Sequence, residues 1–484
     1  MSFELLGRVA TFALPVVYLV GILAAIDAIM RTRTAQGATA WALALVLIPF
    51  VSLPLYFIFG RIKFEEYVEA LRNLDAELQT KVEEARGSSL MDVVVPIENE
   101  PDPRTRGELR AFQVLATAPM TNGNSARLLV NGEATFNAIF AAIDAAQQYV
   151  LAQFYIIHDD KVGRRFKECL IAAARRGVAV HLLYDDVGSS SLPSRYLGEL
   201  GAAGVEVSRF RGSRSWLGRF RLNFRNHRKI VVVDGKDGFT GGLNVGDEYI
   251  GFDSRIGGYR DTHLALTGPA VLGLQYSFIR DWYYSRKAVP PRLRWAPEQA
   301  AANQRALVLA SGPEDNLERC GLLFTHAIES AESRVWIATP YFVPDGRVLG
   351  ALQLAAFRGV DVRVIMPRKS DNFLFTVVPY AYLPDLTRAG VKVFIYEKCF
   401  MHQKVMLVDD DYGAVGTANL DNRSFRLNFE VTCLVSDPGF CREVEAMLLA
   451  DFEHTTQLTE EDLTKQSFGF RLMTQVTRLL SPIL

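Results

Sequence analysis

The sequence predicts an α/β protein built from two tandem domains with pseudo-twofold symmetry, preceded by an N-terminal two-helix transmembrane hairpin. Three observations support this prediction. The 484-residue chain contains one short pattern of His, Lys and Asp twice, similar segments surround both copies, and the first 60 residues are far more apolar than the rest. In each repeat, strand-like and helix-like segments alternate, which is typical of sheets covered by helices.

Residues 1–60 are expected to cross a membrane twice. The segment from Val9 to Met30 is apolar apart from Asp27, and the 22 residues from Ala38 to Phe59 carry no charge. Each segment is long enough to span the hydrocarbon core of a bilayer as a helix. Because the connection between them is short, the two helices form a hairpin with both outer ends on one side of the membrane.

A cleavable signal peptide is the alternative for the first apolar segment, but the second segment favours retained membrane attachment. Basic residues concentrate on the cytoplasmic side of membrane proteins. Four of them lie beside the outer ends of the hairpin and two lie in its turn, namely Arg8, Arg61, Lys63 and Arg72 against Arg31 and Arg33. We therefore expect the rest of the chain to lie in the cytoplasm.

Residues 61–109 are expected to connect the hairpin to the repeats. The part from 61 to 86 is rich in charged, helix-forming residues and predicts a connecting helix. The part from 87 to 110 contains three prolines and predicts a linker.

The two repeats are expected at residues 110–290 and 305–465, and both lengths suit single domains. Each reads as strand, helix, strand, helix and strand, followed by a motif strand and a Gly-rich turn. The Pro-rich, polar stretch between them marks the boundary. The matching segments are 150–155 with 335–341, 174–185 with 356–367, and 200–207 with 386–393.

Both copies of the short motif fit the pattern His-x-Lys-x-x-x-x-Asp, and an Asn follows each His after 17 residues, in a Gly-rich segment. At frequencies of about 5% for Lys and for Asp, two matches with the same Asn offset are not a chance event. The residues are His227, Lys229, Asp234 and Asn244 in the first copy, and His402, Lys404, Asp409 and Asn419 in the second.

The His, Lys and Asn residues of the motif suggest the chemistry that the site performs. Residues two apart on a strand lie on the same face, so the His and Lys of each copy point the same way. His supplies a nucleophile or a general acid and base, Lys a fixed positive charge, and Asn a neutral donor. Two such sets around one volume suit a phosphodiester. One His attacks phosphorus, the other protonates the leaving oxygen, and the cations stabilise the transferring group without a metal ion.

Two carboxylates, Asp261 and Glu430, occupy similar places after the Gly-rich turns. A carboxylate beside a catalytic imidazole holds it in the reactive tautomer, so we predict this supporting role for both residues. The alternative is that they cap strands or pair with the neighbouring Arg260 and Arg426.

The paired motif resembles the signature of the phospholipase D superfamily. The Gly-Gly-x-Asn and Gly-Thr-x-Asn-x-Asp-x-Arg-Ser surroundings, together with the membrane-anchored layout, resemble the bacterial cardiolipin synthases of that superfamily. The resemblance covers essentially the whole chain and implies two phospholipase D-like domains.

The resemblance also implies roles for the motif residues. It implies a ping-pong reaction through a phosphohistidine on His227, while His402 protonates the leaving alcohol and deprotonates the incoming one. Asp234 and Asp409 complete the motifs and are expected to close the strands. The residues implied to hold the phosphate are Lys229, Lys404, Asn244 and Asn419.

The function implied is that of a membrane-bound phosphatidyltransferase of the bacterial inner membrane, which converts two molecules of phosphatidylglycerol to cardiolipin and glycerol. The first alternative is a phospholipase D, in which water replaces the acceptor lipid and phosphatidic acid is the product. A phosphodiesterase acting on nucleic acid and a membrane scaffold with an inactive site are further alternatives. The net charge of −1 and the hairpin count against a nucleic-acid partner.

The remaining features add three expectations. The five Cys residues show neither metal-ligand spacing nor a disulfide framework, and we expect no cofactor and no metal. Residues 466–484 form an amphipathic C-terminal tail that either lies on the membrane or packs on its own domain. The Arg-rich, aromatic segment 209–225 suits an anionic lipid surface, although a solvated loop or nucleic-acid contact explains it as well.

Overall fold

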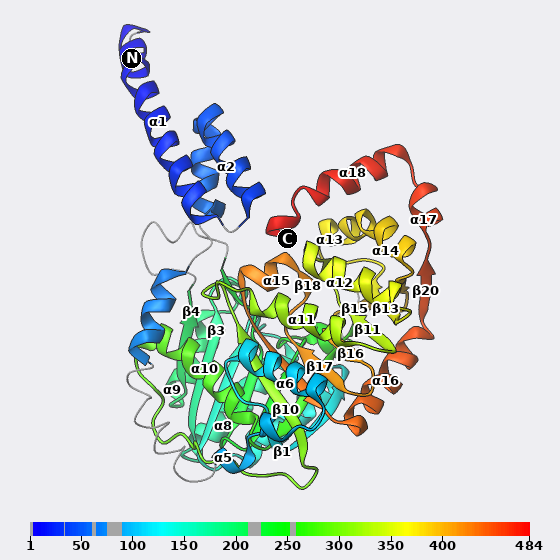
Figure 1. Ribbon diagram of the computed structural model, residues 1–484. Coiled ribbons are helices and arrows are strands. Elements are labelled where there is room, and N and C mark those ends of the chain that lie inside the picture. The colour runs from blue at the N-terminus through cyan, green and yellow to red at the C-terminus, as the bar shows by residue number, and fades with distance from the viewer. Residues whose placement is uncertain (1–2, 33, 61–63, 75–89, 212–223, 252–257) are drawn as a thin grey trace. The chain divides into compact units, whose positions relative to one another are not determined.

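The structure is a computed structural model that describes residues 3–32, 34–60, 64–74, 90–211, 224–251 and 258–484 (Figure 1). The chain divides into two compact units. The smaller unit comprises residues 1–66 and 211–225, and the larger comprises 67–210 and 226–484. Most of the Arg-rich segment 209–225 lies outside the described residues.

In the smaller unit, helix α1 (Phe3–Arg31) packs against α2 (Ala35–Leu47), as Figure 1 shows. Helix α3 (Pro49–Leu55) and the π-helical turn η1 (Tyr56–Gly60) follow. Among the described residues, the part of α1 from Leu14 to Arg31 is the one helical stretch long and apolar enough to cross a membrane.

The predicted second span is therefore not one continuous helix. It breaks at Ile48, whose φ of −134° and ψ of 56° are not helical. The residue before a proline is disfavoured in the α region, and Pro49 follows Ile48 directly. The structure therefore shows one clear apolar N-terminal helix packed against an interrupted one, and it does not confirm the predicted two-helix transmembrane hairpin.

The larger unit contains a sheet in which two halves repeat the same strand order. Read outward from the centre, the first half runs β1-β9-β7-β6-β2-β3-β4 and the second runs β10-β19-β17-β16-β11-β13-β14-β20. The central strands β1 and β10 pair antiparallel. This arrangement agrees with the predicted α/β repeat and relates the halves by a pseudo-twofold axis.

The strands of the first half are β1 (Thr121–Val130), β2 (Tyr149–Phe154), β3 (Ala179–Asp185), β4 (Glu206–Phe210), β6 (Ile230–Val233), β7 (Asp237–Gly241) and β9 (Thr262–Thr267). Those of the second half are β10 (Gln304–Ser311), β11 (Arg334–Ala338), β13 (Asp361–Pro367), β14 (Lys392–Tyr396), β16 (Val405–Val408), β17 (Tyr412–Gly416), β19 (Asn428–Ser436) and β20 (Thr455–Leu458). The short strands are β5 (Arg225–Asn226), β8 (Tyr259–Arg260), β12 (Phe342–Val343), β15 (Phe400–Met401) and β18 (Leu420–Asp421).

Helices cover both halves of the sheet (Figure 1). Those of the first half are α7 (Asn131–Ala145), α8 (Lys161–Arg175), α9 (Ser194–Ala202), η4 (Asp247–Ile250) and α10 (Val271–Arg286). Those of the second are α11 (Arg319–Ser330), α12 (Gly346–Phe357), α13 (Phe373–Val377), η5 (Val378–Ala381), α14 (Leu383–Ala389), α15 (Asn422–Arg426), α16 (Pro438–Phe452) and α17 (Glu460–Thr464). The join between the halves falls at residues 287–303.

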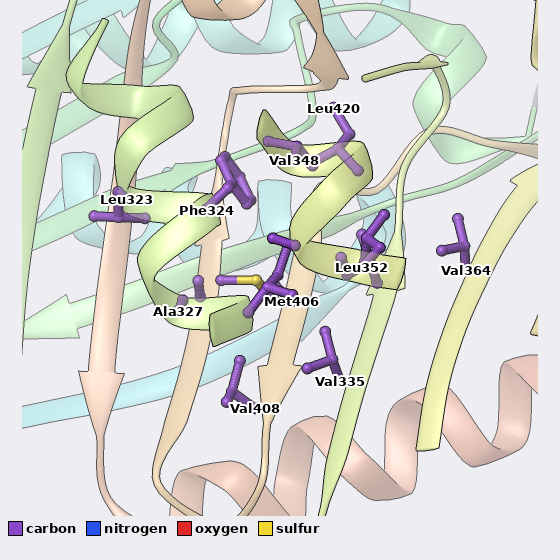
Figure 2. Close-up of a cluster of buried hydrophobic side chains, with 14 of the residues drawn as sticks. Leu323, Phe324, Ala327, Val335, Val348, Leu352, Val364, Met406, Val408 and Leu420 are labelled. Carbon is purple, nitrogen blue, oxygen red and sulfur yellow. The ribbon is translucent and has the colours of Figure 1, made fainter. Parts of the chain in front are cut away.

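The motif strands are held deep in the core. All four residues of β6 and all four of β16 are buried, as expected for apolar runs of Val, Ile, Leu and Met in a covered sheet. Figure 2 shows Met406 and Val408 of β16 in one hydrophobic cluster with Phe324 of α11 and Leu352 of α12. The buried core therefore holds the two strands that directly follow the Lys residues of the motifs.

The predicted linker at 87–110 is wrong for most of its length. Residues 90–110 contribute α5 (Leu90–Val93), η2 (Ile97–Asn99) and most of α6 (Pro103–Ala116). Asp102 caps α6, and Leu109 and Phe112 are buried in the core of the second half. Pro103 is the first residue of this packed helix, because Pro fits the first turn of a helix. Of the predicted connecting helix, residues 65–74 are helical and 75–86 lie outside the described residues.

The C-terminal tail packs on its own half of the sheet. In α18 (Phe468–Arg478), Thr474 and Thr477 are buried, and Phe470 contacts the ring of Tyr380 at 5.4 Å. After η6 (Ser481–Ile483), the carbonyl of Leu484 accepts the backbone N–H of Arg423 at 2.8 Å. The opposite face of α18 is exposed and apolar.

Candidate active site

The two motifs stand at equivalent places, each at the start of a strand in the middle of its half. His227 and Lys229 precede β6, and His402 and Lys404 precede β16. The N–H of His227 donates to the carbonyl of Phe429 in the second half at 3.0 Å, and the N–H of His402 donates to that of Arg260 in the first half at 2.8 Å. The backbone of each motif is therefore attached to the other half.

The last residue of each motif lies at the opposite end of its strand. Asp234 has a φ of 53° and accepts the backbone N–H groups of Gln147, Gln148 and Tyr149, each at 2.8 Å. Each bond fixes the loop that leads into β2. The position agrees with the expectation that this Asp closes the strand.

Asp409 repeats the arrangement in the second half. It has a φ of 50° and accepts the N–H groups of Glu332, Ser333 and Arg334 at 2.7–2.8 Å. These bonds fix the loop before β11. These backbone bonds support the expectation that both Asp residues close their strands.

The predicted carboxylates contact the two imidazoles in a crossed arrangement. Glu430 of the second half accepts Nδ1–H of His227 in the first half, with oxygens at 2.9 and 3.0 Å. Asp261 of the first half accepts Nδ1–H of His402 in the second half at 2.7 Å. These bonds fix each imidazole with its proton on Nδ1 and leave Nε2 as the reactive nitrogen.

The alternative pairing with neighbouring arginines is not present. Arg260 forms a two-point ion pair with Asp451 at 2.6 and 2.8 Å. Arg426 pairs with Glu318 at 2.9 Å. Neither Arg260 nor Arg426 therefore forms an ion pair with the carboxylate beside a motif His.

The environment of Glu430 keeps its carboxylate ionised. Burial acts to raise its pKa, but His227, Lys229 and a 2.5 Å bond from the hydroxyl of Thr417 outweigh it, so the pKa is lowered. Asp261 differs, because burial raises its pKa to about 6 against the opposing effect of Lys404. The carboxylate beside His227 therefore has a lower pKa than the carboxylate beside His402.

Both imidazoles are neutral at neutral pH. Burial lowers the pKa of His227 to about 4, Glu430 opposes the shift, and Lys229 and Lys404 add to it. Burial also lowers the pKa of His402 well below its usual value, and Lys404, Lys229 and His227 add to that shift. The cations of both motifs act on both imidazoles, so the two motifs form one site.

The two lysines are held in the same way. Lys229 donates from Nζ to the carbonyl of His227 at 2.7 Å, and Lys404 donates to the carbonyl of His402. Burial lowers the pKa of Lys229 to about 7 and that of Lys404 to about 8. A buried cation without a full counter-charge is unfavourable, which prepares the site for an anion.

The two predicted asparagines are not equivalent. Asn244 accepts the N–H of Ile156 at 3.1 Å and donates to the hydroxyl of Tyr249 at 2.8 Å. Asn419 is buried, and its Oδ1 has no hydrogen-bond partner among the described residues. Asn419 therefore retains polar capacity inside the site, whereas much of that of Asn244 is used by its surroundings.

Sequence reasoning missed the acids that anchor the middle residue of each motif. Asp281 of α10 accepts both Nη1 bonds of the fully buried Arg228, at 2.8 and 2.9 Å. In the second half, Asp451 of α16 accepts Gln403 at 2.8 Å. The one sequence signal is an acid inside an otherwise buried helix, which does not identify its partner.

Aromatic rings surround the imidazoles. Tyr155 lies edge-on to His227 at 5.2 Å, and Tyr259 lies edge-on to His402 at 5.5 Å. In the described part of the chain, no cluster of three or more His, Cys, Asp or Glu side chains is placed to hold a metal ion. The site is a buried cluster of two imidazoles, two ammonium groups and two carboxylates.

Comparison with known proteins gives matches along the chain. Residues 139–253 and 324–452 match the family model described as cardiolipin synthase, PLD-like domain, and 19–61 match a phospholipase D-nuclease N-terminal model. Cardiolipin synthase A of Pseudomonas putida is 45% identical over 475 residues, which is 98% of each chain. The enzyme of the same name from Pseudomonas fluorescens is 44% identical with the same coverage.

Among solved structures, phosphatidylserine synthase of Haemophilus influenzae matches 78% of this chain and 100% of its own, with a TM-score of 0.60 and 16% identity. Polyphosphate kinase of Porphyromonas gingivalis matches 75% of this chain and 51% of its own, with a TM-score of 0.50 and 12% identity. At these identities the likeness concerns the fold alone.

Proposed function

Because this chain belongs to the phospholipase D superfamily, in its cardiolipin synthase family, we propose that its paired motifs transfer a phosphatidyl group from one phosphatidylglycerol to another. The products are cardiolipin and glycerol. The observation that carries the proposal is the crossed support of two neutral imidazoles, His227 by Glu430 and His402 by Asp261, in one site with two buried lysines. That arrangement suits two successive displacements at one phosphorus.

In the first displacement, Nε2 of His227 attacks phosphorus and the bond from phosphorus to the glycerol oxygen breaks. The ionised Glu430 favours this role for His227, because it stabilises the positive charge that develops on the attacking imidazole. His402 gives its Nε2 proton to the glycerol oxygen, and glycerol leaves. The phosphatidyl group remains on His227.

The proton on His402 depends on the substrate. The two lysines contribute to the low pKa of His402 in the free site. A bound phosphodiester brings a negative charge that offsets the lysines, so it raises the pKa of His402 and of both lysines. Substrate binding therefore favours the protonated forms of His402, Lys229 and Lys404.

In the second displacement, His402 takes the proton from a headgroup hydroxyl of a second phosphatidylglycerol. The hydroxyl oxygen attacks phosphorus, and the bond from phosphorus to Nε2 of His227 breaks. Cardiolipin leaves, and both His residues return to their first protonation states. Lys229 and Lys404 stabilise the charge on the phosphoryl oxygens in both displacements.

Hydrolysis by water is the competing reaction at the same site. To separate the two, the purified protein is incubated with phosphatidylglycerol in mixed micelles and the lipids are analysed by mass spectrometry. Cardiolipin and glycerol in equal amounts are the expected products. Phosphatidic acid without cardiolipin would overturn the transferase proposal in favour of a phospholipase D.

We also propose that the N-terminal unit crosses the bacterial inner membrane twice, with α1 as one span and α2 and α3 as a second, Pro-interrupted span. Membrane helices tolerate such breaks where neighbouring helices satisfy the backbone, and α1 packs against α2. A Thr34→Cys variant tests this topology. Labelling of the turn by an impermeant maleimide from the periplasmic side is expected, and labelling from the cytoplasmic side alone would contradict it.

The outer face of α18 is a second candidate for lipid contact. Phe468, Leu472, Val476 and Leu479 are between 52% and 78% exposed and form an apolar stripe. Residues 468–484 carry two Arg residues and no acid. An exposed apolar stripe with basic flanks is typical of helices that lie in an anionic membrane interface.

A further inference from the structure

The two halves of the site differ in one loop. Asp186 follows β3, and its N–H donates to the carbonyl of Phe210 at 3.0 Å. The N–H that follows β13, that of Arg368, donates to the carbonyl of Tyr396 at 3.2 Å. The two loops therefore start from equivalent positions.

Three residues further along, the first half has Ser189 and the second half has Asp371. Ser189 is buried, and its hydroxyl donates to the carbonyl of Tyr155 at 3.0 Å and accepts the N–H of Ile157 at 3.1 Å. That hydroxyl is used to hold its own loop together. Asp371 is exposed and places a carboxylate at the corresponding position.

Two hydroxyl groups orient the carboxylate of Asp371. Tyr341 donates to Oδ1 at 2.6 Å, and Ser370 donates to the same oxygen at 2.9 Å. Within the described part of the chain, no protein group donates a hydrogen bond to Oδ2. The carboxylate of Asp371 is thus held through Oδ1, and its Oδ2 is available to accept a hydrogen bond from a ligand.

Tyr341 connects this carboxylate to the active site. Its ring lies edge-on to the imidazole of His402 at 6.4 Å and stacks on Phe375 at 4.1 Å. Burial and Asp371 raise the pKa of the Tyr341 hydroxyl well above its usual value, so it stays a neutral donor. Asp371 also acts to raise the pKa of His402 against the effect of burial.

The proposed reaction suggests a ligand for the carboxylate of Asp371. His402 exchanges a proton first with the leaving alcohol and then with the incoming one, so both alcohol oxygens occupy the same side of the site. With phosphatidylglycerol, both alcohols are glycerol headgroups. A carboxylate repels the phosphodiester, which binds at Lys229 and Lys404, but it accepts hydrogen bonds from the hydroxyls of a neutral polyol.

Building on the proposed function, we infer that Tyr341 and Asp371 form an alcohol-binding subsite that holds the glycerol headgroup beside His402. Oδ2 of Asp371 accepts a hydrogen bond from the headgroup hydroxyl that does not react. This bond orients the reacting hydroxyl toward the Nε2 of His402. The asymmetry between Asp371 and Ser189 then confines the alcohol to one side of an otherwise symmetric site.

A competition between two acceptors tests the subsite in the full-length protein. Phosphatidylglycerol serves as donor, with deuterated glycerol and 1-propanol in equal amounts, and mass spectrometry measures deuterated phosphatidylglycerol against phosphatidylpropanol. Because 1-propanol has no second hydroxyl, the ratio of products reports the proposed bond. The expected result is that Asp371→Ala lowers the glycerol-to-propanol ratio by about 10- to 100-fold.

Three further variants sharpen the test. Asp371→Asn keeps an acceptor and is expected to retain most of the ratio, and Tyr341→Phe frees the carboxylate and is expected to lower the ratio less than Asp371→Ala. Asp410→Ala is the matched control, because Asp410 is an acid with a 70% exposed side chain at the far end of β16. It is expected to leave the ratio unchanged.

The outcomes separate the subsite from the reaction itself. An unchanged ratio in Asp371→Ala, or an equal loss with both alcohols, overturns the subsite. A third arm offers ethanolamine, and loss of transfer to ethanolamine in Asp371→Asn without any change in the glycerol ratio overturns it in favour of an ammonium site. If the wild-type protein transfers to neither alcohol, the proposed function fails instead.

Discussion

Glu430 and His227 lie 203 residues apart in the sequence, yet the carboxylate accepts Nδ1–H of the imidazole with both oxygens, at 2.9 and 3.0 Å. The reciprocal bond joins Asp261 to His402 at 2.7 Å. Each half of the sheet thus supplies a His and the carboxylate for the other half's His. Neither half holds a complete site alone.

The crossed pairs predict that Glu430→Gln slows the reaction strongly without removing the binding of phosphatidylglycerol. Gln can keep a hydrogen bond to Nδ1 but loses the charge that stabilises the attacking imidazole. We expect kcat to fall by about 10²- to 10⁴-fold, as for the loss of a supporting carboxylate in other His sites. Asp261→Asn is the matched variant on the other His. Activity within twofold of wild type in both variants would contradict the supporting role.

The burial of Lys229 predicts that its replacement removes activity but stabilises the fold. Its pKa is about 7 when folded and ~10.5 when unfolded, so the unfolded chain binds more protons between these values. Unfolding free energy therefore rises as pH increases from 7 to 10.5, and the penalty is full below pH 7. Lys229→Met is expected to be inactive but more stable at pH 7, by about 1–4 kcal/mol.

Thermal unfolding in detergent at pH 7 and at pH 10 checks the Lys229 prediction. The stability difference between Lys229→Met and wild type is expected to shrink at the higher pH, where the unfolded chain also begins to lose the proton. A variant that is less stable than wild type at pH 7 would show that the ammonium group is well compensated in the folded protein.

Replacement of Asp409 is expected to have the opposite effect, because it lowers the stability of the fold but leaves the catalytic groups in place. Asp409 is buried and accepts three backbone N–H groups at the end of β16 opposite His402. Asp409→Ala leaves these donors unpaired, and we expect destabilisation of about 2–4 kcal/mol, measured by thermal unfolding. The single-turnover rate of the remaining folded enzyme is expected to stay within a few-fold of wild type. A rate loss comparable to that of His402→Ala would place Asp409 in the chemistry.

The exposed stripe of α18 predicts a dependence on the form of the substrate. Leu472→Glu with Leu479→Glu adds negative charge to a face proposed to meet an anionic bilayer. Activity on phosphatidylglycerol vesicles is expected to fall at least tenfold, while activity on dispersed short-chain phosphatidylglycerol falls much less. Gln475→Glu, also exposed on α18, is the control for added charge alone. An equal loss on both substrates would indicate damage to the fold.

The fold and the motif residues could be predicted because both depend on local patterns. The spacing of His, Lys and Asp and the repetition of strand-like runs are visible in the sequence, and the same strand order occurs in both halves. The linker prediction was wrong because a proline can begin a helix as well as end one. Pro103 begins α6, and Leu109 and Phe112 of that helix are buried in the core of the second half.

The partners of the site residues could not be predicted in the same way. Asp261 and Glu430 were recognised as candidates, but nothing local indicates that each supports the His of the other half. The anchoring of Arg228 by Asp281 and the carboxylate of Asp371 beside Tyr341 also depend on contacts between distant segments. Such contacts follow from how the two halves pack, which no periodicity encodes.

Trapping the covalent intermediate shows which of the two His residues attacks phosphorus. The donor is a phosphatidyl ester with a nitrophenol leaving group, which departs without a proton from His402. His402→Ala is expected to accumulate a phosphatidyl adduct on His227, located by mass spectrometry, while His227→Ala and the double variant accumulate none. An adduct in His227→Ala but not in His402→Ala would contradict the assignment and reverse the roles of the two His residues.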